Sequence, residues 1–180
     1  MPVTRLLTSE DAPLLAGLLR ENRAFLEPWQ PRRHDDYFTD RAQQQVVADA
    51  LADRERGRSL PLVIHDAGRV EGMITLQSII RGSFQSCSVG YWLAEEAQGR
   101  GLATTALQEA TRLAFQELRL HRVQAETLPR NGRSQRVLLR VGFVAYGTAQ
   151  AYLKIAGAWQ DCDLYQLLNP EPDLVVVPEQ

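Results

Sequence analysis

Residues 98–103 read Gln98-Gly99-Arg100-Gly101-Leu102-Ala103, a glycine-rich turn between two segments of regular pattern. Before the turn lies an apolar, aromatic stretch typical of a strand, Ser88-Val89-Gly90-Tyr91-Trp92-Leu93. After it, small and apolar residues recur at helical spacing: Ala103, Ala106, Leu107, Ala110, Leu113, Ala114 and Leu118. A strand, a glycine turn and an amphipathic helix in this order predict an α/β fold.

The turn has the properties of a phosphate-binding site. Glycine lacks Cβ, so the backbone at Gly99 and Gly101 can turn sharply and approach a ligand. The unpaired N–H groups of the first helical turn, at Leu102, Ala103 and Thr104, then face an anion, and the helix dipole assists them. A P-loop is excluded because no lysine follows the glycines, and a dinucleotide loop lacks its third glycine. A purely structural turn is the alternative at this point.

A second motif follows about thirty residues later, after a strand candidate at Arg122 to Thr127. It reads Asn131-Gly132-Arg133-Ser134 and then, at the end of a helical pattern, Val141-Gly142-Phe143. As local structure, Asn131 caps a helix and Gly142 ends it in a left-handed turn.

Together the two motifs resemble the GNAT N-acetyltransferases. Residues 98–103 are similar to the Q-x-x-G-x-A acetyl-CoA pyrophosphate loop, and the second motif is similar to the family's N-x-x-S…G-F segment. The resemblance runs from about Arg5 to Leu168. It implies an α/β GNAT fold, a mixed, mostly antiparallel twisted sheet flanked by helices, with splayed central strands that hold acetyl-CoA.

Three further segments resemble the RimJ/RimL branch, and most closely RimJ, the ribosomal-protein alanine N-acetyltransferases. They are residues 21–31, residues 81–84 and the hairpin that contains Tyr152, Trp159 and Asp161. The acetyl-CoA contacts that the resemblance implies are the backbone of one strand end, the glycine turn and the second motif. They comprise Trp92, Leu93, Ala94, Gln98, Gly99, Arg100, Gly101, Leu102, Ala103, Thr104, Asn131 and Ser134.

The family pattern is broken at both catalytic positions. Where many GNAT enzymes carry a tyrosine acid, this chain has Leu138, and the resemblance to the RimJ/RimL branch implies Ser134 as the acid. Its alternative role is to cap the nearby helix. Related members carry a carboxylate where this chain has Ala151, so we expect Glu126 to be the base, with a solvated strand-end glutamate as the alternative. His34 and Asp35 are weaker candidates.

The missing carboxylate favours an α-amine acceptor. An α-amino group with a pKa of about 7.7–8.0 is already neutral in roughly a tenth of molecules near pH 7, and a lysine in well under roughly a thousandth. The resemblance implies transfer to a protein N-terminus, with a ribosomal protein as the candidate partner. A small-molecule amine acceptor and a non-catalytic acyl-CoA-binding module are the alternatives. The residues expected to line the acceptor cleft are aromatic: Phe25, Trp29, Tyr37, Phe84 and Tyr152.

Composition limits the remaining choices. With 180 residues, 44% of them hydrophobic, we expect one domain at residues 1–169 and a C-terminal tail at 170–180. A net charge of −2 and the absence of a long apolar run argue against nucleic-acid and membrane partners. Cys87 and Cys162 form no disulfide framework or metal site, so no metal is expected and both thiols should be buried. The chain is interpreted as a cytoplasmic monomer or homodimer.

Several elements outside the motifs are also predicted. A first strand should cover residues 3–7, followed by a capping box from Thr8 to Asp11. A helix should cover residues 40–56, and a hairpin should join residues 60–65 to residues 70–80. The segment Val175-Val176-Val177 is assigned to the tail, where disorder is expected and addition to a sheet edge is the alternative.

Overall fold

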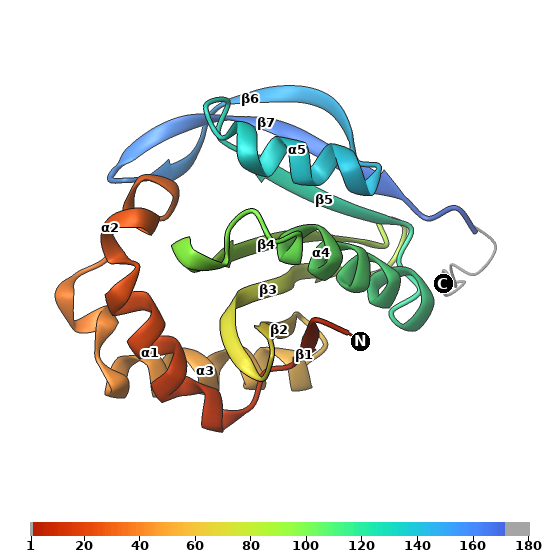
Figure 1. Cartoon of the computed structure of the whole chain (residues 1–180). Helices are drawn as coiled ribbons and strands as arrows, with labels where there is room; N and C mark the ends of the chain where they lie inside the picture. Colours follow the sequence, from red (N-terminus) through yellow and green to blue (C-terminus); the bar gives the residue numbers. More distant parts are fainter. Residues whose placement is uncertain (1, 172–180) are drawn as a thin grey trace.

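The computed structural model describes residues 2–171, in which seven strands form one sheet in the order β1-β2-β3-β4-β5-β7-β6 (Figure 1). The neighbouring strands are antiparallel except β4 and β5, which are parallel. The sheet therefore has the mixed, mostly antiparallel character that the sequence predicts. The strands are β1 Thr4–Leu6, β2 Leu60–Asp66, β3 Arg69–Ile80, β4 Ser86–Leu93, β5 Arg122–Thr127, β6 Val144–Ile155 and β7 Ala158–Leu168.

Helices pack on both faces of the sheet, and alternation along β2 separates the two hydrophobic clusters. Leu62 and Ile64 belong to the large cluster with α4 and α5, whereas Val63 between them belongs to the cluster with α1 and α3. The α-helices are α1 Ala12–Glu21, α2 Arg23–Leu26, α3 Asp40–Glu55, α4 Leu102–Arg112 and α5 Gly132–Val141. The other helical segments are η1 Ser9–Asp11, η2 Glu27–Trp29, η3 Asp35–Phe38, η4 Glu95–Ala97 and η5 Leu113–Glu117, a π-helical continuation of α4.

The divergence of β4 from β5 is the feature that positions the site. The two strands pair only through Ser86–Arg122, Cys87–Val123 and Ser88–Gln124. Beyond Ser88, β4 continues to Leu93 with a partner on one side only, β3. The two arms of the sheet thus meet at one end and separate toward α2 (Figure 1). Because backbone groups on the free side of β4 have no strand to bind, they are available to a ligand.

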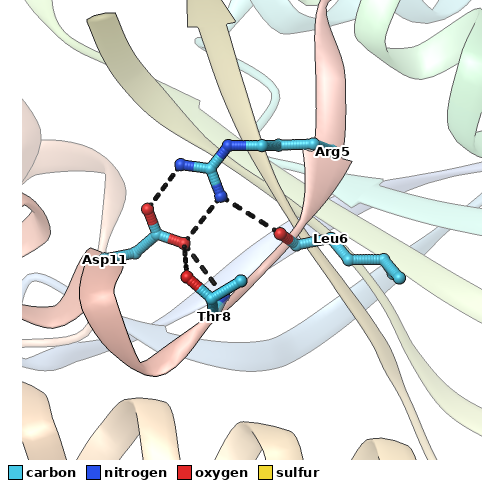
Figure 2. A network of polar contacts seen from close by, with 4 residues as sticks. All are labelled: Arg5, Leu6, Thr8 and Asp11. Atoms are coloured by element: carbon cyan, nitrogen blue, oxygen red, sulfur yellow. Dashed lines mark hydrogen bonds and ion pairs between the residues drawn. The ribbon is translucent and has the colours of Figure 1, made fainter.

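An ion pair joins β1 to the start of the first helical segment (Figure 2). The Arg5 guanidinium donates to both carboxylate oxygens of Asp11, at 2.8 and 2.6 Å. Asp11 also accepts the backbone N–H of Thr8 at 2.9 Å, which completes the predicted capping box. The Asp11 side chain is only 2% exposed, so these donors replace the water that it loses on burial.

The predictions for the regular elements are confirmed. The first strand, the helix at residues 40–56, the hairpin at residues 60–80 and the left-handed end of α5 at Gly142 (φ 101°) are all present. Cys87 and Cys162 are free and buried. Val175 to Val177 lie outside the described residues. Within residues 2–171, no helix is both long enough and apolar enough to span a bilayer.

Candidate active site

The space between the diverging ends of β4 and β5 holds two connected cavities. The larger, of about 580 Å³, reaches the glycine turn through Leu93, Gln98 and Ala103. The smaller, of about 220 Å³, contains Glu126 and lies against β6. The cavities share the residues that line their boundary, namely Leu26, Trp29, Tyr91, Trp92, Asn131 and Ser134. A long ligand that enters at the glycine turn can therefore extend past Ser134 toward Glu126.

The glycine turn has the conformation that the sequence predicts. Gly99 and Gly101 have φ angles of 74° and 81°, a left-handed conformation that favours glycine. A Cβ built on either residue would meet no atom within 4 Å, so the space above the turn is open. Gly101 is the N-cap of α4, and its carbonyl accepts from Thr105 N–H. The N–H groups of residues 102–104 precede that first helical hydrogen bond and can bind an anion.

The side chains of Arg100 and Gln98 stabilise the position of the glycine turn. The Arg100 guanidinium forms ion pairs with Asp66 and Glu71 of the β2–β3 hairpin, so its charge is engaged with the sheet. Gln98 Nε2 donates to the carbonyls of Leu93 and Ala94, both at 3.4 Å. Both side chains therefore hold the turn against the sheet.

The end of β4 presents alternate backbone groups to the gap. Ala94 N–H donates to Glu71 O at 2.8 Å, and the Trp92 carbonyl lies against Gly72 of β3. Because strand groups alternate in direction, the N–H and C=O groups of Tyr91 and Leu93 point away from β3 into the cleft. Among the residues expected to offer backbone contacts, Leu93 faces the gap, whereas the Trp92 carbonyl and the Ala94 N–H are engaged with β3. Tyr91, which the resemblance did not single out, faces the gap with Leu93.

Ser134 lies in the first turn of α5 and does not cap it. Asn131 Oδ1 performs the capping by accepting the Ser134 N–H at 3.2 Å. The Ser134 hydroxyl is instead 2.9 Å from Tyr91 Oη across the cleft. Burial raises the pKa of Tyr91 to about 12, and this hydrogen bond offsets only part of that effect. The pair places two neutral hydroxyl groups at the junction of the cavities.

Glu126 lies on β5 and lines the smaller cavity together with Ser134. Its half-buried carboxylate accepts a hydrogen bond from Ser88 Oγ at 3.2 Å. Burial raises the pKa of Glu126 above its ordinary range, although the Ser88 hydrogen bond partly opposes this. The negative charge of Glu126 in turn raises the pKa of Tyr152 on β6. An acid-base group thus faces the end of the cleft opposite the glycine turn.

The other base candidates are elsewhere. His34 is exposed and lines a separate surface pocket, and Asp35 pairs with Arg23 at 2.6 Å. Ala151 sits in an irregular part of the β6–β7 ladder with a φ of 47°, and its N–H donates to Asp161 Oδ1 at 2.8 Å. Among residues 2–171, no group of three or more His, Cys, Asp and Glu side chains is arranged to hold a metal ion.

The structure brings only some of the selected aromatic residues to the cleft. Phe25 lines the larger cavity and Trp29 lines both, whereas Tyr152 is 45% exposed and lines neither. Tyr37 packs edge-on against Phe38 and lines neither cavity. Phe84 precedes the paired end of β4, far along the strand from the gap, so its placement in the acceptor cleft is not supported.

Some lining residues were not anticipated. Leu26, Tyr91 and Thr127 all line the smaller cavity, and the buried Thr127 Oγ1 has no hydrogen-bond partner within residues 2–171. Strand alternation could have identified Tyr91, because it shares a face of β4 with Val89 and Leu93. Leu26 arrives from the helical segment after α1, which no strand pattern could locate.

Comparison with known proteins agrees with this geometry. The family described as "Acetyltransferase (GNAT) domain" matches residues 3–144. Over 171 residues the chain is 36% identical to the probable N-acetyltransferase YjcK of Bacillus subtilis, covering 94% of each protein. It is 34% identical to the [ribosomal protein uS5]-alanine N-acetyltransferase of Escherichia coli, covering 94% of this chain and 88% of that one.

Solved structures give the same result. RimJ of Mycobacterium smegmatis in complex with a CoA disulfide superposes with a TM-score of 0.90 at 30% identity, covering 93% of this chain and 82% of that one. The open glycine turn, the free edge of β4 and the Asn131 segment fit the pyrophosphate and pantetheine parts of acetyl-CoA. The chain therefore belongs to the GNAT acetyltransferase family, as an acyltransferase whose cleft takes acetyl-CoA as the acetyl donor.

Proposed function

We propose that the protein acetylates the α-amino group of a protein N-terminus, with a ribosomal protein of the N-terminal alanine type as its substrate. The observation that carries the proposal is that Glu126 and Ser134 line one small cavity at the inner end of the acetyl-CoA cleft. The Escherichia coli relative, which is named for ribosomal-protein alanine acetylation, supports the acceptor class. We also propose that residues 1–169 are a single catalytic domain, followed by a tail at 170–180, and that the enzyme works in the cytoplasm.

The proposed reaction is direct attack by the neutral amine on the thioester carbonyl. A new N–C bond forms, the C–S bond breaks, and its electron pair leaves on sulfur. The amine proton passes to the Glu126 carboxylate, directly or through one water. One gap-facing N–H group of β4, that of Tyr91 or that of Leu93, donates to the developing oxyanion, and Ser134 Oγ donates a hydrogen bond to the leaving sulfur.

The pKa of an α-amine acceptor is matched to Glu126 as a single, partly buried base. Burial raises the pKa of Glu126, so it is a better base than an exposed glutamate, yet it remains far weaker than a lysine amine. It can receive a proton from an α-amine that is already partly neutral near pH 7. A lysine side chain would have to be deprotonated against a much larger free-energy difference.

Surface charge favours a peptide over a polyamine. A pocket of about 460 Å³ is lined by Arg32, Arg33, His34 and Lys154. These residues lie close to Gln30 and Ile155 in the sequence, and Gln30 and Ile155 line the smaller cavity. Within residues 2–171, none of Arg32, Arg33 and Lys154 forms an ion pair with a carboxylate. Ala156 N–H donates to Gln30 O at 2.9 Å and joins the two chain segments here. These cations repel a polyamine and attract acidic residues of a peptide.

The test is an acceptor panel with acetyl-CoA. It comprises a peptide with a free N-terminal alanine, the same peptide with a blocked N-terminus and an internal lysine, and spermidine. We expect thiol release and a mass increase of one acetyl group only with the free N-terminus. Acetylation of spermidine alone would support the small-amine alternative. Tight CoA binding without transfer to any acceptor would support the non-catalytic module.

A further inference from the structure

The hydroxyl groups of Tyr91 and Ser134 form a hydrogen bond across the acetyl-CoA cleft, between β4 and α5. Tyr91 Oη lies 2.9 Å from Ser134 Oγ and 3.4 Å from the Ser134 carbonyl oxygen. Tyr91 belongs to β4 and Ser134 to α5, so the contact joins the two walls of the cleft where its two cavities meet. A thioester at this junction would therefore lie beside the pair.

Either hydroxyl can donate in the Tyr91–Ser134 hydrogen bond, and the two directions leave different hydrogens free. With its pKa raised to about 12, Tyr91 keeps its proton throughout the pH range of enzyme assays. Ser134 Oγ and the Ser134 carbonyl oxygen can both accept a hydrogen bond from Tyr91, and the carbonyl oxygen can act only as an acceptor. When Tyr91 donates to Ser134 Oγ, the hydrogen of the serine hydroxyl is free to rotate toward the cavity. If Ser134 donated to Tyr91 instead, the serine would have no hydrogen left for a substrate.

We infer that Tyr91 is a positioning residue that keeps Ser134 Oγ–H directed at the sulfur leaving from acetyl-CoA. The inference rests on the proposed role of Ser134. A chain in which one hydroxyl donates to the next also polarises the second O–H bond, which makes Ser134 a stronger donor than an isolated serine. Tyr91 itself acts through Ser134 and need not touch the sulfur.

The pKa values of the thiol and of the two hydroxyl groups determine whether the thiolate receives a proton or only a hydrogen bond. An alkyl thiol has a pKa of about 8.5, well below that of the Tyr91 phenol. Transfer of the phenol proton to the thiolate is therefore uphill, and the same holds for the still less acidic serine. The pair stabilises the thiolate by a hydrogen bond while the C–S electron pair moves to sulfur. The thiolate then takes its proton from solvent when CoA is released.

The decisive experiment measures the pKa of the CoA thiol in the binary complex, because it needs no acceptor. The thiolate is titrated by its ultraviolet absorbance in complexes of the wild type, Tyr91→Phe, Ser134→Ala and the double variant. We expect Tyr91→Phe to raise the pKa of the bound thiol by about 0.5 to 1 unit. In the Ser134→Ala background the same substitution should change it by less than about 0.2 unit, because the intermediary is gone.

Steady-state kinetics provide the second measurement. Tyr91→Phe should lower kcat about five- to tenfold and leave the KM for acetyl-CoA within about twofold. Tyr146→Phe is the matched control, since its hydroxyl receives a hydrogen bond from Gln124 outside the cleft, and its kcat should equal the wild-type value. Thermal unfolding of all variants shows whether the loss is merely structural.

Two outcomes overturn the inference. One is a bound-thiol pKa that is the same in the wild type and Tyr91→Phe. The other is a Tyr91→Phe effect that persists undiminished in the Ser134→Ala background. Failure of the proposed function is a separate result, because it would appear as missing acetyl transfer by the wild type, whatever the thiol titration shows.

Discussion

Ser88 Oγ, from the last residue pair of the β4–β5 ladder, donates a hydrogen bond to Oε1 of Glu126, two residues past its ladder partner Gln124, at 3.2 Å. The contact therefore sits at the inner corner of the cleft, where the strands begin to separate. It stabilises the charged form of Glu126, while burial favours the neutral form and prevails, so the pKa is raised. The acid-base property of Glu126 thus depends on a partner from the opposite strand.

The first prediction concerns the acidic limb of the pH–rate profile. Glu126 must be ionised to accept a proton, so the rate should fall as the pH drops through its raised pKa, above the ordinary value of about 4.3. Glu126→Gln should remove this limb and lower kcat about tenfold or more. Ser88→Ala removes a donor to the carboxylate, so it should move the limb upward by about 0.5 to 1 unit. An unchanged limb in Glu126→Gln would eliminate Glu126 as the base.

The second prediction concerns Ser134. Ser134→Ala should reduce kcat about 10- to 100-fold, because the leaving sulfur loses its hydrogen-bond donor. The affinity for acetyl-CoA, measured by calorimetry, should stay within about threefold since the backbone contacts remain. Ser83→Ala, in the exposed turn before β4, is the control and should behave as wild type. Equal kcat values for both variants would show that Ser134 has no part in the chemistry.

The third prediction separates strain from binding at the glycine turn. Gly101→Ala forces a Cβ into a φ of 81° and should destabilise the protein by about 1–2 kcal/mol. Gly82→Ala is a matched control, because Gly82 has a φ of 69°, open space around it and a place in the turn between β3 and β4. Both variants should lose similar stability in chemical denaturation, but only Gly101→Ala should raise the KM for acetyl-CoA. Equal KM values in the two variants contradict a phosphate site at residues 99–104.

The fourth prediction concerns Asp11 and acid stability. Burial alone would raise the pKa of Asp11, but the hydrogen bonds from Arg5 and Thr8 outweigh it and hold the pKa below its ordinary value. The carboxylate therefore contributes stability above a pH of about 4, and this contribution is lost as the pH falls through the lowered pKa. Asp11→Asn should lower the free energy of unfolding by about 1–3 kcal/mol at pH 7 and flatten its acid dependence.

The control for Asp11 is Asp35, whose pair with Arg23 is exposed on both sides. Asp35→Asn should change the free energy of unfolding by less than about 1 kcal/mol. If urea unfolding gave the same small change for both variants, the pair of Arg5 with the buried Asp11 carboxylate shown in Figure 2 would not anchor the N-terminal strand.

The fifth prediction concerns acceptor charge. With peptides that differ only in one acidic residue after the N-terminal alanine, we expect the acidic peptide to have the higher kcat/KM. Neutralising Arg32 and Lys154 together should reduce this preference about two- to fivefold, and added salt should do the same. Scanning the acidic residue along the peptide locates the pocket relative to the acceptor amine. A preference unaffected by both the substitutions and salt would assign no acceptor role to this pocket.

The local features of the site follow from the sequence because neighbouring residues dictate them. Gly99 and Gly101 adopt left-handed φ angles that other residues rarely allow, Asn131 caps α5, and Gly142 ends it. Each of these conformations depends on contacts within a few residues. The same segments carry the resemblance from which the family and acetyl-CoA were inferred, and the comparisons confirmed both.

Only the tertiary structure decided which distant side chains meet in the cleft. Tyr91 and Ser134 are 43 positions apart, and their contact depends on how β4 and α5 face each other. The engagement of Arg100 with Asp66 and the distance of Phe84 from the gap likewise depend on strand register and chain path. A pattern of residue types reports the direction of a side chain relative to its own strand or helix, but not which element stands opposite. That choice is made by packing across the whole sheet, so it became visible only in the folded chain.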